Sequence, residues 1–298
     1  MDSASLYFRA YYGVPPTVGS APDGTPVNAV RGFLDALGTL IRTRRPERMV
    51  CALDASWRPA WRVALVPGYK AHRVAADGGE QAPDALVSQV PIILRTLEAL
   101  GIATVGVPEF EADDVLATLA AREAGPVEVA TGDRDLFQVV DDARAVRVLY
   151  FARGVARLEV VDDAAVLARF GVPAARYPDL ATLRGDPSDG LPGVSGVGQK
   201  TAARLIADHG GVDDILRALD EHAEGFSPAL AIKINLARQY LAAALAVTTA
   251  RVDVPVGPLD DSLSVQGADP AVLTHLAERY GLSGPLRRIS AAIEDPTP

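Results

Sequence analysis

Cysteine, lysine and long hydrophobic runs are all scarce in this chain of 298 residues. Cys51 is the single cysteine and lies in an apolar stretch, so we expect a buried, inert thiol rather than a metal ligand or a nucleophile. No hydrophobic run approaches the ~18 residues of a membrane span, and the sequence opens with Asp2 rather than with a basic, apolar leader. We therefore expect a cytoplasmic protein with no membrane partner.

The net charge is −9, which by itself argues against a nucleic-acid partner. The distribution of the charges argues differently. Nine carboxylates fall in the motifs described below, and the remaining acids equal the 29 Lys and Arg residues in number. Between positions 42 and 73 only Glu47 and Asp54 oppose a strip of eight basic residues: Arg42, Arg44, Arg45, Arg48, Arg58, Arg62, Lys70 and Arg73.

Strands and helices alternate in the first half of the chain, and helices dominate the rest. Apolar runs predict strands at 48–53, 102–107, 126–130, 145–149 and 156–160, and 3.6-residue periodicity predicts helices at 26–42, 83–100 and from 111 onward. This alternation predicts an α/β fold with a parallel sheet, followed by an all-helical part. Residues 55–83 lack periodicity and are expected to form a long, partly helical excursion.

Acidic residues are expected to gather at one rim of the sheet. Asp54 and Asp133 follow strands directly, Glu111 stands between a strand and its helix, and Asp2 would end a first strand. Glu111 and Asp114 share a helix face, with Asp113 turned away by roughly 100°. Each acid singly reads equally well as a helix cap. Together they would repel one another unless divalent cations such as Mg²⁺ or Mn²⁺ neutralised them.

A pair of such ions is typical of sites that catalyse phosphodiester hydrolysis, so the acids indicate a nuclease or a phosphatase. The four histidines (72, 209, 222 and 275) are scattered, so zinc is not expected. The basic strip, interleaved with Trp57, Trp61 and Tyr69, favours a polyanionic substrate over a small phosphate ester. The alternative is a solvated face with two core tryptophans.

The stretch GDPSDGLPGVSGVGQKTAARLI, residues 185–206, combines two further acids with a glycine-rich helix start. Glycines at 193, 196 and 198 allow close backbone approach, and Lys200 stands in the first turn of a helix predicted over 200–207. This arrangement suits a phosphate or a cation held by main-chain groups. A glycine-rich helix start without a ligand is the alternative.

Five motifs in order resemble the structure-specific 5′-nuclease family, which includes flap endonucleases and the 5′→3′ exonuclease domains of bacterial DNA polymerase I. They are DSASLYFRAYY, ALDASWRPAWR…PGYKAHR, EFEADDVLATLA, ATGDRDLFQVV and the 185–206 stretch, and the likeness extends to about residue 250. The chain resembles the free-standing bacterial form. The resemblance implies a PIN-like parallel-sheet nuclease core at 1–161 with a helical arch at about 56–90. A helical DNA-binding domain of the helix–three-turn–helix type would follow at 162–298.

The resemblance also implies a role for each matched residue. The metal ligands would be Asp2, Asp54, Glu111 and Asp113 for a first ion, and Asp114, Asp133, Asp135, Asp186 and Asp189 for a second. Asp133 and Asp135 would also count as catalytic, with Arg9 and Lys70 polarising the scissile phosphate. DNA would be bound by Phe8, Arg73, Gly193, Ser195, Gly196, Val197, Gly198 and Lys200, and main-chain groups of Val194, Ser195 and Val197 would hold K⁺.

The implied activity is metal-dependent 5′→3′ exonuclease and flap endonuclease cleavage near single-strand/duplex junctions, giving 5′-phosphate products. The implied partners are 5′-flap, nicked or overhang DNA, with RNA in RNA/DNA hybrids as a further substrate, and the protein would act as a monomer. Two alternatives are a non-catalytic DNA-junction binder with an impaired metal site and a small-molecule Mg²⁺ phosphohydrolase.

The sequence departs from the family pattern twice. No apolar strand precedes Asp2, which puts that ligand in question, and Gly190 replaces the usual Asn, for which a looser turn is expected. The tail 255–298 is expected to pack against the helical domain.

Overall fold

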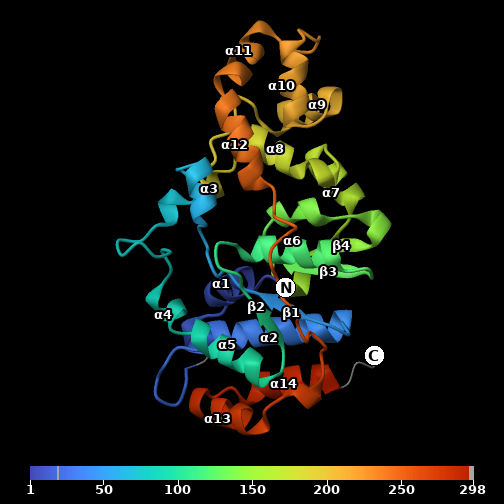
Figure 1. Ribbon diagram of the computed structural model, residues 1–298. Helices are drawn as coiled ribbons and strands as arrows, with labels where there is room; N and C mark the ends of the chain where they lie inside the picture. The colour runs from blue at the N-terminus through green and yellow to red at the C-terminus, as the bar shows by residue number, and fades with distance from the viewer. Residues whose placement is uncertain (19, 295–298) are drawn as a thin grey trace.

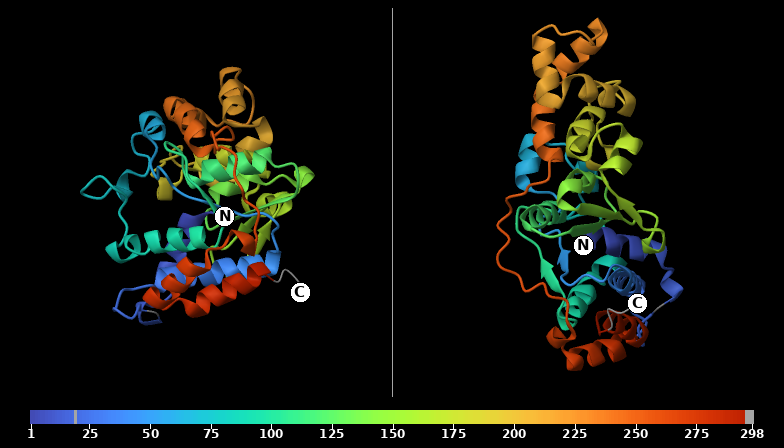
Figure 2. Two further views of the ribbon diagram at one scale, coloured as in Figure 1. Left: turned by 60° about the horizontal axis from the view of Figure 1, so that its bottom comes forward. Right: turned by 90° about the vertical axis from the view of Figure 1, so that its right-hand side faces the viewer.

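The computed structural model describes residues 1–18 and 20–294, and it is elongated. Figures 1 and 2 show a mixed α/β region in the middle, a helical region at one end and the helices α13 and α14 at the other.

The central sheet is built from two parts joined by the first residues of the chain. β1 (Val50–Ala52) pairs in parallel with β2 (Ala103–Val105), and β3 (Val127–Thr131) pairs in parallel with β4 (Val146–Tyr150). Asp2 bridges Ala52 in parallel, and its N–H donates to the Ala130 carbonyl at 2.9 Å. The first two residues thus join β1 to β3 and fix Asp2 between them.

The sheet is not wholly parallel, because β5 (Glu159–Val161) runs antiparallel to β4. The short connection between them, residues 151–158, allows a hairpin but no crossover helix. The predicted parallel sheet is confirmed, and it carries one antiparallel strand at this edge.

The helices of this region surround the sheet. α1 and α2 pack against each other, and α6 leads into β3. The bounds of the helices are α1 Ser3–Gly13, α2 Asn28–Arg44, α3 Ala60–Leu65, α4 Asp84–Val87, α5 Val90–Ala99 and α6 Ala112–Arg122, with short 3₁₀ turns at Pro16–Val18, Ala71–Arg73, Asp135–Val139, Asp142–Arg144 and Val155–Arg157.

The helix predicted over 83–100 is two helices, α4 and α5. Pro91 at the start of α5 cannot donate a helical hydrogen bond, and the break falls at Ser88–Gln89. Gln89 is fully buried and accepts hydrogen bonds from the Ala29 and Val30 N–H groups, so the break lets it cap α2.

The helical region follows β5. Its helices are α7 Asp163–Phe170, α8 Tyr177–Arg184, α9 Gln199–His209, α10 Val212–Asp220, α11 Pro228–Leu236 and α12 Arg238–Thr248, with 3₁₀ turns at Ala174–Arg176 and Pro187–Asp189. The prediction of a helix over 200–207 is confirmed by α9. Its buried face (Ala202, Leu205, Ile206) joins a core that continues into the α/β region through Phe137 and Tyr177.

The sequence analysis predicted that the C-terminal tail packs against the helical region. In the described part of the tail, the helices α13 and α14 pack instead against the α/β region. After a 3₁₀ turn at Val265–Gly267, α13 (Pro270–Tyr280) contacts α5, and α14 (Ser283–Glu294) lies along α2. Ile289 is fully buried against Gly38 of α2, whose missing side chain lets the two helices approach. The amphipathic pattern of α14 gave no means of choosing between two apolar surfaces.

Within residues 1–18 and 20–294, no single helix is long and apolar enough to cross a membrane. α11 and α12 reach that length and composition only as a pair bent by 65°.

Candidate active site

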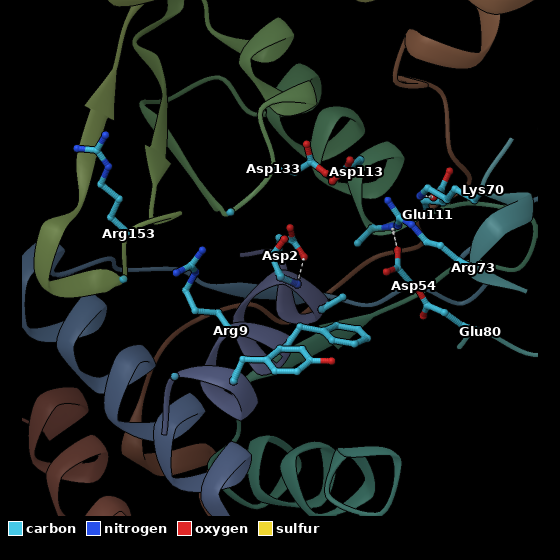
Figure 3. Close-up of a pocket in the computed structure, with 18 residues that line it drawn as sticks. Asp2, Arg9, Asp54, Lys70, Arg73, Glu80, Glu111, Asp113, Asp133 and Arg153 are labelled. Carbon is cyan, nitrogen blue, oxygen red and sulfur yellow. Dashed lines mark hydrogen bonds and ion pairs between the residues drawn. The ribbon is translucent and has the colours of Figure 1, made fainter. Parts of the chain in front are cut away.

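Five of the nine predicted acids line one open cavity of about 700 Å³ at the carboxyl ends of the strands. They are Asp2, Asp54, Glu111, Asp113 and Asp133. The sheet and the helix starts position them: Asp2 caps α1, Asp54 and Asp133 follow β1 and β3 by two residues, and Glu111 and Asp113 stand at the start of α6. Figure 3 shows Asp113 and Asp133 side by side, with Asp2 and Asp54 facing the same space.

Hydrogen bonds hold these carboxylates without using up their oxygens. In Asp2 the Ser5 N–H donates to Oδ1 at 2.9 Å, and the Thr131 hydroxyl donates to Oδ2 at 2.7 Å. Asp54 Oδ1 accepts from the Ala112 N–H at 2.7 Å, and Asp133 Oδ1 accepts from the Asp135 N–H at 3.0 Å. Each of these oxygens accepts one hydrogen bond and therefore keeps lone-pair capacity for a further partner.

The electrostatics of the cavity oppose full ionisation. Although solvent reaches Asp54, enclosure by the cavity walls raises its pKa to about 7; the Ala112 N–H and Lys70 oppose the rise, and Asp2 and Glu111 add to it. Burial raises the pKa of Asp113 well above its usual range, and the charges of Asp133, Asp2, Asp54 and Glu111 raise it further. Divalent cations bound here would relieve this repulsion.

We expect divalent cations to stabilise the protein more at about pH 8 than at about pH 5. A carboxyl whose folded pKa is raised from 3.8 to about 7 contributes stability below its unfolded pKa, and this contribution is lost as the pH rises through 7. A cation that binds the ionised acids offsets that loss. Thermal melts in EDTA and in Mg²⁺ at both pH values check this; an equal Mg²⁺ effect at the two values would contradict it, and Asp113→Asn should flatten the pH dependence.

Asp135, Asp186 and Asp189 do not line the cavity, but they lie close to Asp133. Burial raises the pKa of Asp135, and the charges of Asp133, Asp189 and Asp186 raise it further, so the four form one acidic neighbourhood. Arg73 binds Asp189 at 3.2 Å, and Arg184 stands 3.6 Å from Asp186. In the described structure this second group is thus partly neutralised by arginines.

Asp114 does not line the cavity, and its role as a metal ligand stays a prediction. Its side chain is fully buried, and its two oxygens accept four hydrogen bonds: two from Arg62 at 2.7 Å each, one from the Glu111 N–H and one from the Arg251 N–H. These donors occupy the carboxylate completely. The sequence spacing placed Asp114 and Glu111 on one face of α6, and in the structure both carboxylates on this face bind Arg62.

Glu111 links the cavity to this buried pair. Lys70 forms an ion pair with Glu111 Oε1, and Oε2 accepts from the Tyr69 hydroxyl at 2.7 Å and from Arg62 at 2.5 Å. Lys70 also lines the cavity, as do Arg73, Arg9 and Phe8. The sequence therefore identified three of the cavity's four basic residues, but neither Arg153 nor the contacts that Lys70 makes.

The predicted basic strip does not form one surface. Arg62 is 3 % exposed, whereas Arg44 pairs with Glu128 and Arg48 with Asp261 and Glu123 on the far side of β1. Tyr69 is buried, and Trp61 packs its ring on the Arg62 guanidinium at 4.5 Å. Only Lys70 and Arg73 of the eight basic residues reach the cavity.

The donor set fits hard divalent cations, because the acids that line the cavity offer oxygen ligands and neither cysteine nor histidine lines it. In the part of the chain that the structure describes, no three His, Cys, Asp or Glu side chains lie close enough to hold one ion by themselves. Such ions would therefore keep several waters, as Mg²⁺ does.

The glycine-rich loop lies away from the cavity, between α8 and α9. Gly193 and Gly196 have φ of +67° and +76°, and a side chain at Gly196 would meet the Lys233 ammonium at 2.8 Å. The Val197 N–H donates to the Val194 carbonyl at 2.9 Å, and Gly198 caps α9 ahead of Lys200. Ser195 is exposed, whereas Val194 and Val197 are buried. The structure thus keeps this group of residues apart from the acids.

The turn at Gly190 is tight rather than loose, contrary to expectation. Gly190 has φ of +72°, and a Cβ there would stand 2.4 Å from the Gly68 carbonyl oxygen. The Lys70 N–H donates to the Asp189 carbonyl at 2.9 Å. Glycine at 190 therefore lets the base of the 56–90 excursion contact the loop that carries Asp186 and Asp189.

Four cavity-lining residues lie outside the five motifs, namely Gly13, Glu80, Arg153 and Gly154, and Tyr12 lies in the first motif without an assigned role. Arg153 belongs to no motif and reaches the cavity through the β4–β5 turn. For Tyr12, the helical period of α1 was an available signal: Phe8 and Tyr12 are four residues apart, so they share a helix face and would line the same cavity.

Comparison with known proteins accounts for both regions. Residues 1–171 match the family model described as the 5′-3′ exonuclease N-terminal resolvase-like domain. The chain belongs to the 5′-3′ exonuclease family. Residues 172–271 match the model of the family's C-terminal SAM fold, so a resolvase-like domain precedes a SAM-like helical domain. The boundary at residue 161 stays a prediction.

Individual members of the family are similar along most of their length. A 5′-3′ exonuclease of Streptomyces coelicolor is 52% identical and covers 97% of both chains. DNA polymerase I of Mycobacterium tuberculosis is 39% identical over 90% of this chain, which spans 29% of that protein. The bacteriophage T5 D15 flap endonuclease, solved in a pseudo-enzyme-product complex with DNA and metal ions, has a TM-score of 0.66 at 17% identity and covers 99% of this chain and 98% of its own. These likenesses confirm the predicted family, and the chain is a hydrolytic nuclease.

Proposed function

We propose that this 5′-3′ exonuclease family member hydrolyses DNA phosphodiester bonds near single-strand/duplex junctions by a two-metal mechanism that leaves 5′-phosphate products. One observation carries the proposal: six carboxylates, five of them among the predicted acids, and four basic residues face the same open cavity. A cavity lined by acids alone would suit metal ions without a substrate. Basic side chains beside the acids suit a substrate that is itself an anion.

The proposed ligands are the predicted acids that line the cavity and the acids beside Asp133. Asp2, Asp54, Glu111 and Asp113 would hold a first Mg²⁺ or Mn²⁺, and Asp133, Asp135, Asp186 and Asp189 would hold or surround a second, partly through water. When bound, such ions supply a water nucleophile activated at neutral pH and neutralise charge that develops on the phosphate. The D15 complex, which contains DNA and metal ions, supports the proposal that this chain binds both.

The chain's own residues orient the phosphate. Lys70 and Arg9 stand at opposite sides of Asp2 in Figure 3, so a phosphate above the acids would meet a cation on either side. Arg73 would contact the adjacent phosphate, and Phe8 would stack on a terminal base. Lys70 binds Glu111 in the described structure, so engaging the substrate requires this ammonium to exchange one anion for another.

The helical domain would hold the duplex. The backbone amides around Gly193, Gly196 and Gly198, with Lys200, would contact phosphates, and main-chain oxygens of Val194, Ser195 and Val197 would bind K⁺. Its distance from the cavity would fix how far into the duplex the cut falls. We propose that the protein acts as a monomer and also accepts RNA in RNA/DNA hybrids.

A labelled 5′-flap DNA tests the proposal in Mg²⁺, in Mn²⁺ and in EDTA. We expect cleavage with either ion, none in EDTA, and ends that carry a 5′-phosphate. Cleavage in EDTA would contradict the metal mechanism. Tight junction binding without cleavage in either ion would favour a non-catalytic junction binder, and hydrolysis of small phosphate esters alone would favour a phosphohydrolase.

A further inference from the structure

The cavity continues past the acids along α1. Its wall there consists of Arg9, Tyr12 and Gly13 from α1 and of Arg153 and Gly154 from the turn between β4 and β5. In Figure 3, Arg9 and Arg153 lie on one side of Asp2, and Lys70 and Arg73 lie on the other. The cavity therefore has two cationic ends with the acids between them, and only the end at Lys70 and Arg73 adjoins the 56–90 excursion.

The arginines at the α1 end lack partners. Within residues 1–18 and 20–294, neither Arg9 nor Arg153 makes a hydrogen bond or ion pair to another side chain, whereas Arg73 binds Asp189 and Lys70 binds Glu111. A guanidinium without a carboxylate partner beside an acidic cavity is available to bind phosphate, for which its planar fork is suited.

Tyr12 supplies an aromatic surface at the same end. Its side chain is 72% exposed although its ring is large and apolar, and Tyr11 packs edge-on against it at 5.1 Å and 82°. Tyr12 lies one helical turn beyond Phe8, ~6 Å along the axis, which is about two base steps of ~3.4 Å. An exposed ring beside two cations is the composition of a platform for single-stranded nucleic acid.

The space in front of Tyr12 is open. A Cβ added at Gly13 or at Gly154 would meet no atom within 4 Å, so both glycines border open space on the cavity wall. The turn itself is anchored, because Phe151 is fully buried and its carbonyl accepts from the Gly154 N–H at 2.7 Å. Arg153 thus projects from a fixed turn into open space.

We propose that Tyr12 and Arg153 form a nucleotide subsite. The Tyr12 ring stacks on an unpaired base near the scissile phosphate, on the side of the acids away from the excursion, and the Arg153 guanidinium binds the phosphate of that nucleotide. The subsite makes the enzyme favour substrates that have an unpaired nucleotide at this position. The inference rests on the proposed nuclease function and adds a specificity determinant to it.

Equilibrium binding of 5′-flap DNA, with Ca²⁺ in place of Mg²⁺, tests the subsite without turnover. We expect Tyr12→Ala to raise the Kd about tenfold and Tyr12→Phe, which keeps the ring, to leave it unchanged. Arg153→Ala should raise the Kd and lower the slope of log K against log salt by about one, whereas Arg157→Ala, in the same loop but outside the cavity, should not. Melting temperatures confirm that each variant is folded.

Flaps with a single abasic nucleotide at successive positions locate the stacked base. At one position the abasic site should weaken binding to the wild-type protein about tenfold and cause no further loss in Tyr12→Ala. The subsite is wrong if Tyr12→Ala or Arg153→Ala binds like wild type, or if the abasic penalty is the same with and without the Tyr12 ring. Binding is measured without cleavage. A wild-type protein that binds the flap but never cuts it in Mg²⁺ would therefore overturn the nuclease proposal, while the binding data would still test the Tyr12 subsite.

Discussion

Asp133→Asn should lower the rate of 5′-flap cleavage by about a hundredfold or more while leaving the Kd for the same DNA within about twofold. Asp133 faces the cavity from the end of β3 and adds to the rise in pKa of both Asp113 and Asp135, so its carboxylate lies between the two acidic groups. Its neutral isostere removes a charge that both proposed ions would share, and a lost electrostatic contact of this kind costs about 10²–10³ in rate. The phosphate loses a repelling neighbour, so binding does not suffer.

The matched control is Asp213→Asn, the same chemical change at an exposed position in the first turn of α10. It should cleave like wild type. Single-turnover cleavage and binding in Ca²⁺ are measured on the same substrate, because only the pair separates chemistry from affinity. Full activity of Asp133→Asn, or a loss of binding that matches the loss of rate, would show that Asp133 does not act in the chemical step.

The sequence predicted the residues at the rim better than their partners. Asp54 and Asp133 follow strands, and the direction of a parallel sheet alone brings such residues together. Asp114 was grouped with them, but its carboxylate binds Arg62 and does not line the cavity, because helical spacing says which residues share a face and not what that face meets. The deciding partner, Arg62, lies 52 positions earlier in a stretch without periodicity.

The same distinction explains the errors in the fold. Periodicity correctly indicated a helix near the C-terminus, but the apolar face of α14 fits α2 through Gly38, a contact between residues some 250 positions apart. The break before α5 was foreseeable from Pro91, whereas the use of the break was not, because Gln89 becomes a cap only once α2 is beside it. Local signals such as Pro91 can be identified in the sequence, whereas contacts between distant residues can be identified only once the fold is known.

Arg62→Met should destabilise the protein by about 3–5 kcal/mol, the cost of removing one partner from a buried ion pair. Arg62 is 3 % exposed and donates to Asp114 with both terminal nitrogens, to Glu111, and through Nε to the Val247 carbonyl of α12 at 3.1 Å. Methionine keeps the apolar stem against Trp61 but leaves Asp114 fully buried with only two backbone donors. Thermal or urea unfolding measures the loss.

Two comparisons identify the cause. Arg58→Met removes an arginine of the same excursion whose contacts are two backbone carbonyls, and it should cost clearly less. Adding Asp114→Leu to Arg62→Met removes the stranded charge, so the double variant should be more stable than Arg62→Met alone. A double variant that is less stable would mean that Asp114 has a role beyond neutralising Arg62, and its assignment as a structural residue would be wrong.

The ion pair between Arg62 and Asp114 connects three parts of the molecule. We therefore expect Arg62→Met to affect function as well as stability. Arg62 belongs to the excursion, Asp114 to α6, and the Val247 carbonyl and Arg251 N–H to the end of α12 and the segment after it. Glu111, a proposed metal ligand, shares the Arg62 guanidinium with Asp114. Below its melting temperature, Arg62→Met should therefore bind Mn²⁺ more weakly than wild type by calorimetry, whereas Arg58→Met should not. Equal Mn²⁺ affinity in the two variants would confine Arg62 to stability.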